Sequence, residues 1–401
     1  MQQIKSPLAP NSSLPAQNSP SGRVYFLDNL KTFIILLVVF FHSAYAYSIY
    51  YSVDWYVIDT QKSLFFDVFI TVAFAFMMPT MFFVAGYFGN RSLASKGLLP
   101  FWKDKLYRII IPWALGVLIL APARAYMHSL SRHLYPSYLC YWGHYFFGKE
   151  YQTHGQAQFY FLGMLTLFYA VLSVVYIIRR RIGNISNKPT KPSSLFFVIF
   201  GLATGLIFFG GNLVIGEAIW PKIAIFDVPG SRFIPYMAYF FLGVFAYKRQ
   251  WFTPSGYNPA LKRWLPICLP MCPLSFFLFL IFLDKKLMPG EIGMACYSLS
   301  YFFFCMTAVF SLLAFFQKRI DFTSGLLASL SANSYAIFFI HYSVILWIIL
   351  ALRELQWNPF VKWLSVGILS VIVCYVVARY ALSKTPMFSS KVRPAQGIQY
   401  A

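Results

Sequence analysis

Long apolar runs alternate with short polar connections along most of this chain of 401 residues. A window of about 20 apolar residues is long enough to cross a bilayer as an α-helix. Ten such windows occur, of which the sixth is short. They lie near residues 30–50, 64–88, 109–127, 157–178, 194–215, 232–247, 264–283, 292–316, 329–351 and 360–382. The pattern predicts an all-α polytopic membrane protein with about ten transmembrane helices.

Composition supports this class, because 59% of the residues are hydrophobic, 11% are charged and the mean hydropathy is +0.61. About a quarter of the residues in a soluble domain are charged. The N-terminal segment, the even-numbered connections and the C-terminal segment carry 23 of the 33 Lys and Arg residues. They carry only three of the 12 Asp and Glu residues. Cytoplasmic connections hold the Lys and Arg excess, so both termini are predicted to be cytoplasmic. The basic excess predicts contact with membrane lipids rather than with nucleic acid.

The chain divides into one membrane domain and two tails. Residues 1–22 are rich in Pro, Ser, Asn and Gln, which is typical of a disordered tail. Residues 23–383 form the predicted transmembrane domain, and 384–401 a cytoplasmic C-terminal tail. The longest outer connection, 128–156, is aromatic, and we expect it to pack over the outer mouth of the bundle.

Lys31 and His42 stand eleven residues apart in the first apolar run. At about 100° per residue they share one helix face, and the rise puts His42 roughly 16 Å above Lys31. An ionisable side chain near mid-bilayer is costly and indicates a functional site. The alternative is a structural histidine that bonds to a neighbouring helix.

His341 lies about 12 residues, or roughly 18 Å, beyond the start of another span that also runs outward. The two histidines are therefore predicted to reach a similar depth. An imidazole with an ordinary pKa near 6.5 is a natural general base for a hydroxyl proton. These residues favour an enzyme in which His42 is the base and His341 its partner.

Lys105 and Arg108 are three residues apart, so they are expected to share a face where the third span enters the membrane. We interpret them, with Lys31, as an anion clamp for phosphates. Asp28 is one turn before Lys31 and is expected to pair with it. The alternative is that these cations only anchor the helices on the cytoplasmic side.

The six cysteines predict no disulfide framework, because five fall inside spans. The sixth, in an outer connection, has histidines nearby, but their irregular spacing argues against a metal site. We therefore predict no metal site among these residues, which are Cys140, His128, His133, His144 and His154.

Several short segments resemble, in the same order, motifs of the acyltransferase-3 family of bacterial membrane O-acyltransferases, including its glucan biosynthesis protein C branch. RVYFLDNLK with His42 resembles the family's opening and its Arg/Lys-x10-His motif, with Lys31 as the cation. KLYRIIIP resembles its Arg-x-x-Arg motif, with Lys105 and Arg108 in those places. The other segments are FFVAGYF, QFYFLGML, RFIPYMAYFFLGVFAYKR and SYAIFFIHYSVIL. The resemblance runs from about residue 23 to 383.

The resemblance implies transfer of a short acyl group, acetyl or succinyl, to a hydroxyl of a cell-envelope carbohydrate. The donor would be acetyl-CoA or succinyl-CoA on the cytoplasmic side of a bacterial inner membrane, used as a co-substrate with no bound cofactor. Lys at 31 and 105, where arginine is usual, keeps the charge but loses the bidentate fork. Ala85 stands where serine is common, and Tyr160 where tryptophan is common.

A transporter or exporter of a small solute or lipid-linked sugar is the alternative from another class. Proton-coupled carriers usually place Asp or Glu within spans. Here Asp67, Glu217 and Asp227 lie near span ends, and inverted repeats are not evident. A third alternative is a non-catalytic scaffold, in which the aligned Lys31 and His42 would have no function. The acyl group, the acceptor and the oligomeric state stay open.

Overall fold

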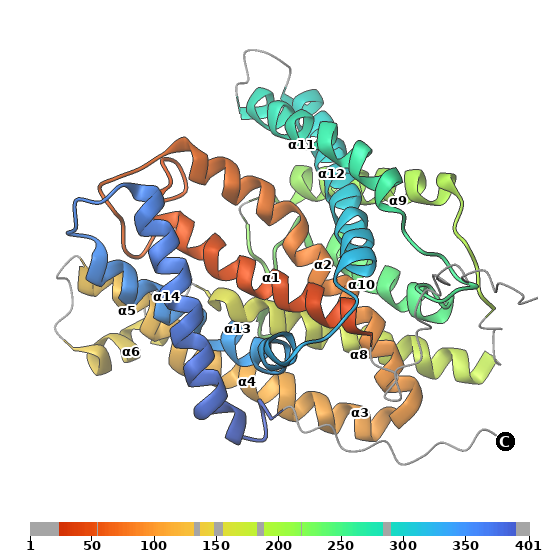
Figure 1. Cartoon of the computed structure of the whole chain (residues 1–401), viewed down its shortest axis with the longest axis horizontal. Helices are drawn as coiled ribbons and strands as arrows, with labels where there is room; N and C mark the ends of the chain where they lie inside the picture. The colour runs from red at the N-terminus through yellow and green to blue at the C-terminus, as the bar shows by residue number, and fades with distance from the viewer. Residues whose placement is uncertain are drawn as a thin grey trace, which may run out of the picture.

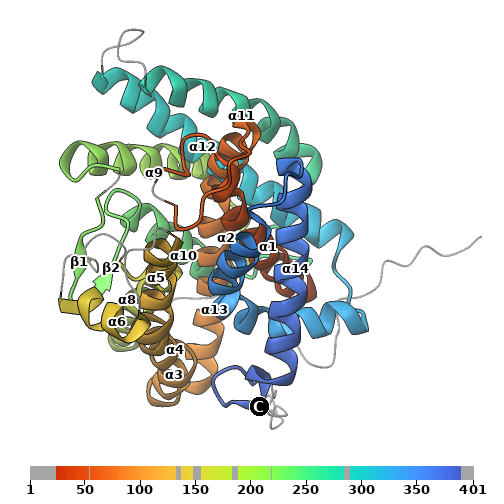
Figure 2. The same cartoon turned by 90° about the vertical axis from the view of Figure 1, so that its left-hand side faces the viewer.

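The computed structural model describes residues 24–53, 55–131, 137–147, 155–182, 188–217, 219–283 and 290–389. The predicted N-terminal tail and residues 390–401 of the C-terminal tail lie outside this part. Figure 1 shows helices throughout, with two short strands visible in Figure 2. The long helices are α1 (Tyr25–Ala44), α2 (Leu64–Lys96), α8 (Tyr160–Ile182), α9 (Ser194–Val214), α11 (Leu261–Leu283), α12 (Gly290–Arg319), α13 (Gly325–Leu352) and α14 (Pro359–Tyr380).

The third span is one long, uneven helix over residues 98–131. Its ordinary turns alternate with two π-helical turns, which widen the helix and turn the following side chains to a new direction. The pieces are α3 (Leu98–Lys105), η2 (Leu106–Ile110), α4 (Ile111–Leu115), η3 (Gly116–Leu120) and α5 (Ala121–Ser131). The shorter elements are η1 (Tyr45–Tyr47), α6 (Tyr138–Phe147), η4 (Ala157–Phe159), β1 (Lys222–Ile223), β2 (Phe226–Asp227), α10 (Phe233–Lys248) and η5 (Leu382–Lys384).

The predicted all-α polytopic class is confirmed. Among the described residues, nine helices are long and apolar enough to cross a membrane. The remaining predicted span, the sixth along the chain, is α10, which has 16 residues and is shorter than a perpendicular crossing requires. The short sixth window in the sequence therefore corresponds to a short apolar helix within the bundle.

The first span begins and ends earlier than its hydropathy predicts. Helix α1 ends at Ala44, and one further turn, η1, ends at Tyr47. The carboxylate of Asp67 then accepts hydrogen bonds from the Ser48 hydroxyl and from the backbone N–H groups of Ile49 and Tyr50. These bonds fold the chain back although it remains apolar. His42 consequently lies in the last turn of α1 and not at the middle of the helix.

Helices α2 and α10 pack with their backbones in contact. A Cβ atom on Gly86 would lie 1.9 Å from the Phe240 carbonyl oxygen, and one on Gly243 would lie 2.0 Å from the Phe83 carbonyl oxygen. These distances leave no room for a side chain at either position. Small residues at a crossing allow two helices to approach this closely. Gly86 belongs to the FFVAGYF segment, so the contact gives that motif a packing role.

Helix α1 lies in the middle of the bundle, with α2 and α13 beside it (Figure 1). Its first turn is tied to the connection between α12 and α13. Asn29 donates to the carbonyls of Ile320 and Phe322, and the Phe26 N–H donates to Asp321. Both segments belong to the side that the charge pattern predicts to be cytoplasmic.

A buried ion pair stabilises the end of the bundle opposite the predicted cytoplasmic side. Lys362 Nζ lies 2.7 Å from Asp59 Oδ2, and both side chains are 0% exposed. Lys362 also donates to the Arg353 carbonyl at 3.0 Å. The pair joins the connection after α1, the end of α13 and the first turn of α14. Because both side chains are inaccessible to solvent, water could not compensate either charge if its partner were lost.

We expect Lys362→Met to lower the thermal stability of the purified protein strongly. The substitution leaves the Asp59 carboxylate buried without its counter-ion, which costs about 3–5 kcal/mol in comparable sites. The midpoint of thermal unfolding in detergent measures the effect. The double variant Lys362→Met with Asp59→Leu should recover much of the loss. Lys262→Met, at an exposed lysine, is the matched control. Equal midpoints for the Lys362 and Lys262 variants would show that the pair does not hold this end together.

Candidate active site

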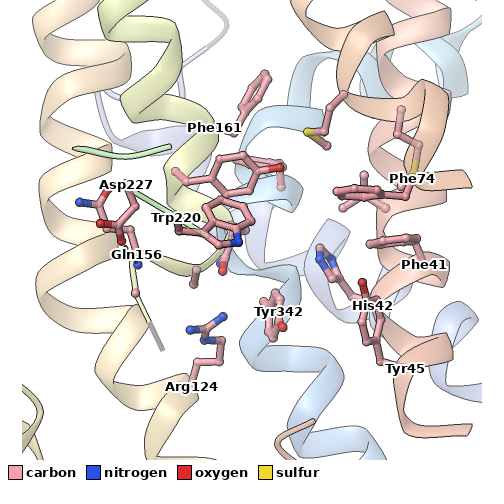
Figure 3. Close-up of a pocket in the computed structure, with 18 of the residues that line it drawn as sticks. Phe41, His42, Tyr45, Phe74, Arg124, Gln156, Phe161, Trp220, Asp227 and Tyr342 are labelled. Atoms are coloured by element: carbon pink, nitrogen blue, oxygen red, sulfur yellow. Dashed lines mark hydrogen bonds between the residues drawn. The ribbon is translucent and has the colours of Figure 1, made fainter. Parts of the chain in front are cut away.

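A cavity of about 750 Å³ lies between α1, α2, α5, α8, α13 and the β1–β2 hairpin (Figure 3). One side of its lining is apolar and comes largely from α1 and α2. It includes Val38, Phe41, Phe74, Met77 and Met78. The other side carries polar and aromatic groups: Arg124, Gln156, Tyr160, Trp220, Lys222 and Asp227. A cavity with an apolar wall and a few convergent polar groups is the usual form of a small-molecule site.

The two predicted histidines meet at this cavity. His42 Nδ1 on α1 lies 3.0 Å from His341 Nε2 on α13. His42 is among the lining residues, whereas His341 behind it is 0% exposed. The sequence predicted similar depth for the two imidazoles, and the structure shows direct contact.

The hydrogen-bond pattern defines the protonation of the neutral pair. His341 Nδ1 lies 2.6 Å from the Phe338 carbonyl oxygen, which can only accept a hydrogen bond. His341 Nδ1 therefore carries a hydrogen, and its Nε2 is the acceptor. His42 Nδ1 must then donate, so in the neutral ring His42 Nε2 carries no hydrogen and is the basic nitrogen. This tautomer is the one that a general base requires.

Aromatic rings and one arginine surround His42. The Tyr342 ring centroid lies 4.6 Å from that of His42, and Tyr45 and Trp55 stack at 4.3 Å beside it. The Arg124 guanidinium carbon lies 4.5 Å from the Tyr56 ring centroid and 5.1 Å from that of Tyr342. Arg124 is 5% exposed and lines the cavity. A buried guanidinium held by ring faces is a fixed positive charge near the histidine.

The far wall of the cavity is held by hydrogen bonds to Gln156. Its backbone N–H donates to Asp227 Oδ2 at 2.8 Å, and its side chain accepts from Trp113 Nε1 at 2.9 Å. Burial raises the pKa of the Asp227 carboxyl, while the Gln156 N–H and Lys222 act in the opposite direction. Gly155 beside it has φ +53°, and a Cβ there would lie 2.9 Å from Asp227 Oδ2. The loop is thus shaped around this carboxylate.

The three predicted donor-binding cations form two separate ion-pair groups. Lys31 Nζ lies 3.9 Å from Asp28 Oδ1, which places Asp28 in the predicted position. Lys105 Nζ and Arg108 Nε lie 3.9 and 3.3 Å from the carboxylate oxygens of Asp104. None of the three cations is among the residues that line the described cavity. Tyr160, in contrast, does line it.

Lys105 and Arg108 differ in environment although their spacing predicts a common face. The Lys105 side chain is 14% exposed and its ammonium lies 4.5 Å from the Tyr169 ring centroid, whereas the Arg108 side chain is 49% exposed. The π-helical turn η2 begins between them, so the angle between successive side chains is no longer that of an α-helix. Both side chains nevertheless reach Asp104.

Sequence reasoning missed several cavity residues. Arg124 falls inside the predicted span 109–127 but near its end, where a charge reads equally well as a topology signal. Trp220, Asp227 and Gln156 lie in connections, where no periodic pattern marks them. Among the described residues no group of three or more His, Cys, Asp or Glu residues could hold a metal ion. His133 and His154 lie outside that part, and all six cysteines are free thiols.

Comparison with known proteins shows similarity to one family. A family model described as an acyltransferase domain matches residues 24–379. Glucans biosynthesis protein C of Shigella dysenteriae serotype 1 (strain Sd197) is 25% identical over 247 residues, which are 59% of this chain and 62% of that protein. The protein of the same name from Escherichia coli (strain K12) matches with the same identity and coverage. The matched segment thus spans less than two thirds of these relatives. No solved structure matches the chain.

The cavity geometry predicts which histidines react with diethyl pyrocarbonate. This reagent acylates accessible neutral imidazoles, so His42 should be modified from the cavity and His341 should not. His144, which is exposed, is the positive control. Peptide mass spectrometry over a time course measures the modification. Modification of His341 as fast as that of His144 would contradict the buried position of the second imidazole.

Proposed function

The chain belongs to the acyltransferase family that matches it over residues 24–379, and from this membership we propose a specific reaction. The protein is a membrane acyltransferase. We propose that it moves a short acyl group, acetyl or succinyl, from a cytoplasmic acyl-CoA to a hydroxyl of a cell-envelope carbohydrate. The transporter that the sequence left open as an alternative does not agree with this family.

Two observations support the carbohydrate acceptor and the compartment. The relatives from Shigella and Escherichia coli are named for glucan biosynthesis. Their bacterial origin and the multi-pass helices support a place in a bacterial inner membrane. We assign the catalytic unit to residues 23–383, which the family match nearly fills.

The hydrogen-bonded pair of His42 and His341 is the observation that carries the mechanism. In the proposed reaction, His42 Nε2 takes the proton of the acceptor hydroxyl as its oxygen bonds to the thioester carbonyl carbon. The carbon–sulfur bond then breaks, and the His42 imidazolium returns the proton to the departing thiolate. An ester and free CoA result, and no other reactant is needed.

His341 acts in this scheme through His42. Its Nδ1–H is held by the Phe338 carbonyl, so its Nε2 faces His42 as an acceptor. This keeps the hydrogen of His42 on Nδ1 and orients the ring, and it stabilises the imidazolium when the proton arrives. An orienting group behind a base is a recurrent arrangement in acyl-transfer enzymes.

Lys31, Lys105 and Arg108 hold the donor phosphates at the cytoplasmic side in this proposal. Lys31 lies three helical turns before His42 on the continuous helix α1. The part of the donor between its phosphates and its thioester must therefore span roughly 16 Å. Asp28 and Asp104 keep the cations in place. The apolar side of the cavity, from Val38 to Met78, would receive the acyl chain.

His42→Ala should abolish transfer while the protein still folds and inserts. Loss of a general base lowers kcat by about 10²–10⁴-fold. Transfer of labelled acetyl or succinyl from the CoA thioester measures it, beside His144→Ala as a control on a histidine outside the cavity. We expect a smaller loss for His341→Gln. A fully active His42 variant would eliminate this mechanism.

Lys31→Glu should raise the KM for acyl-CoA with little change in kcat, because a phosphate contact made equally in the ground and transition states affects binding alone. Steady-state kinetics with the donor varied separate the two constants. Lys262→Glu places the same charge change on an exposed lysine of the predicted cytoplasmic side. An unchanged donor KM in the Lys31 variant would argue against the phosphate role.

A further inference from the structure

The connection between α9 and α10 forms a hairpin that closes one side of the cavity. The backbone N–H of Gly230 donates to the Ile219 carbonyl at 3.1 Å, and that of Val228 to the Pro221 carbonyl at 3.0 Å. Strands β1 and β2 continue the same antiparallel pairing, with Lys222 opposite Asp227. The hairpin therefore holds Trp220 and Asp227 in fixed positions on the cavity wall.

Asp227 has one carboxylate oxygen without a partner. Its side chain is 5% exposed, and Oδ2 receives the Gln156 N–H. Oδ1 is buried and has no hydrogen-bond partner in the structure. A buried polar atom without a partner is costly and needs an explanation. Asp227 is nevertheless among the cavity-lining residues, so a turn of its side chain would bring an unsatisfied acceptor to a ligand hydroxyl.

Trp220 supplies a large aromatic surface on the same side of the cavity. The residue is 45% exposed, and its ring meets that of Tyr160 in an edge-to-face contact at a centroid distance of 4.9 Å. Figure 3 shows Trp220 between the Asp227–Gln156 wall and His42. An indole in a cavity offers its apolar face to a flat apolar surface of a ligand.

We propose that Asp227 and Trp220 form the acceptor subsite and hold a neutral pyranoside ring. The Asp227 carboxylate turns toward the cavity and accepts a hydrogen bond from a ring hydroxyl, and the indole of Trp220 packs against the C–H face of the sugar. This assignment rests on the proposed function, since it identifies the acceptor of that same cavity. It also gives the ring a fixed direction relative to His42.

The charge of the lining separates this ligand from a cationic one. A carboxylate beside an indole is also a common site for an ammonium group. Arg124 and Lys222, however, line the same cavity, so two cations face one carboxylate. A cationic ligand would be repelled, whereas a neutral polyol is not. The polar groups around Trp220 thus favour a sugar.

Saccharide binding to the full-length protein tests the proposal. The probe is maltohexaose, followed by saturation-transfer NMR with the protein in lipid nanodiscs, so that no sugar-based detergent competes. Asp227→Asn keeps an amide oxygen for the Gln156 N–H and removes the carboxylate acceptor. Trp220→Ala removes the stacking surface. Each should weaken binding by about ten-fold or more, as expected for loss of a charge-assisted hydrogen bond or a stacked ring.

Two matched variants control for the residue type. Glu291→Gln neutralises an exposed acidic residue, and Trp357→Ala removes a tryptophan with 47% exposure; neither lines the cavity. Both should bind maltohexaose as the unmodified protein does. Absence of binding by the unmodified protein would overturn the proposal. So would equal binding by the Asp227 and Trp220 variants.

The same samples keep this test separate from that of the acyltransferase reaction. His42→Ala should retain maltohexaose binding while it loses acyl transfer. Saccharide binding without any His42-dependent use of acyl-CoA would leave the subsite in place and refute the reaction. Acyl transfer that depends on His42 but not on Asp227 or Trp220 would refute the subsite alone.

Discussion

The interior of a membrane bundle offers little water, so a buried polar side chain without a partner in the protein is costly. This constraint organises the structure around a few polar contacts between distant segments. Lys362 pairs with Asp59 at one end, and Arg232 pairs with Glu217 under the faces of Phe74 and Phe208. The bond between His42 and His341 is a contact of the same kind. It differs because one of its members faces a cavity.

The helices and the connections contribute different parts of the site. Helices α1 and α13 pack directly, so they hold the two imidazoles with the precision of a packed core. The opposite wall comes from the 155–158 loop and the β1–β2 hairpin, which Gln156 joins. Connections vary more easily than packed helices. The two imidazoles therefore lie on the rigid side of the cavity, and the opposite wall is the part that sequence changes alter most easily.

Some features could be predicted from single residues, and others could not. His42 was visible because an ionisable group inside an apolar run is costly. Arg124 and Lys362 follow the same rule but lie near span ends, where charges read equally well as topology signals. The different exposure of Lys105 and Arg108 depends on the π-helical turn between them. A π-helical turn leaves no mark in the hydrophobic pattern, because it changes the angle between residues and not their identity.

The sequence by itself determined the membrane class, the approximate spans and the histidine on α1. Each of these follows from local properties: twenty apolar residues satisfy their own backbone as a helix, and an ionisable group among them stands out. Only the tertiary structure decided that His42 Nδ1 meets His341 Nε2, and that Trp220 and Asp227 line the same cavity as His42. Those contacts join residues as far as 299 positions apart. Their distances depend on how the helices pack, which no local pattern encodes.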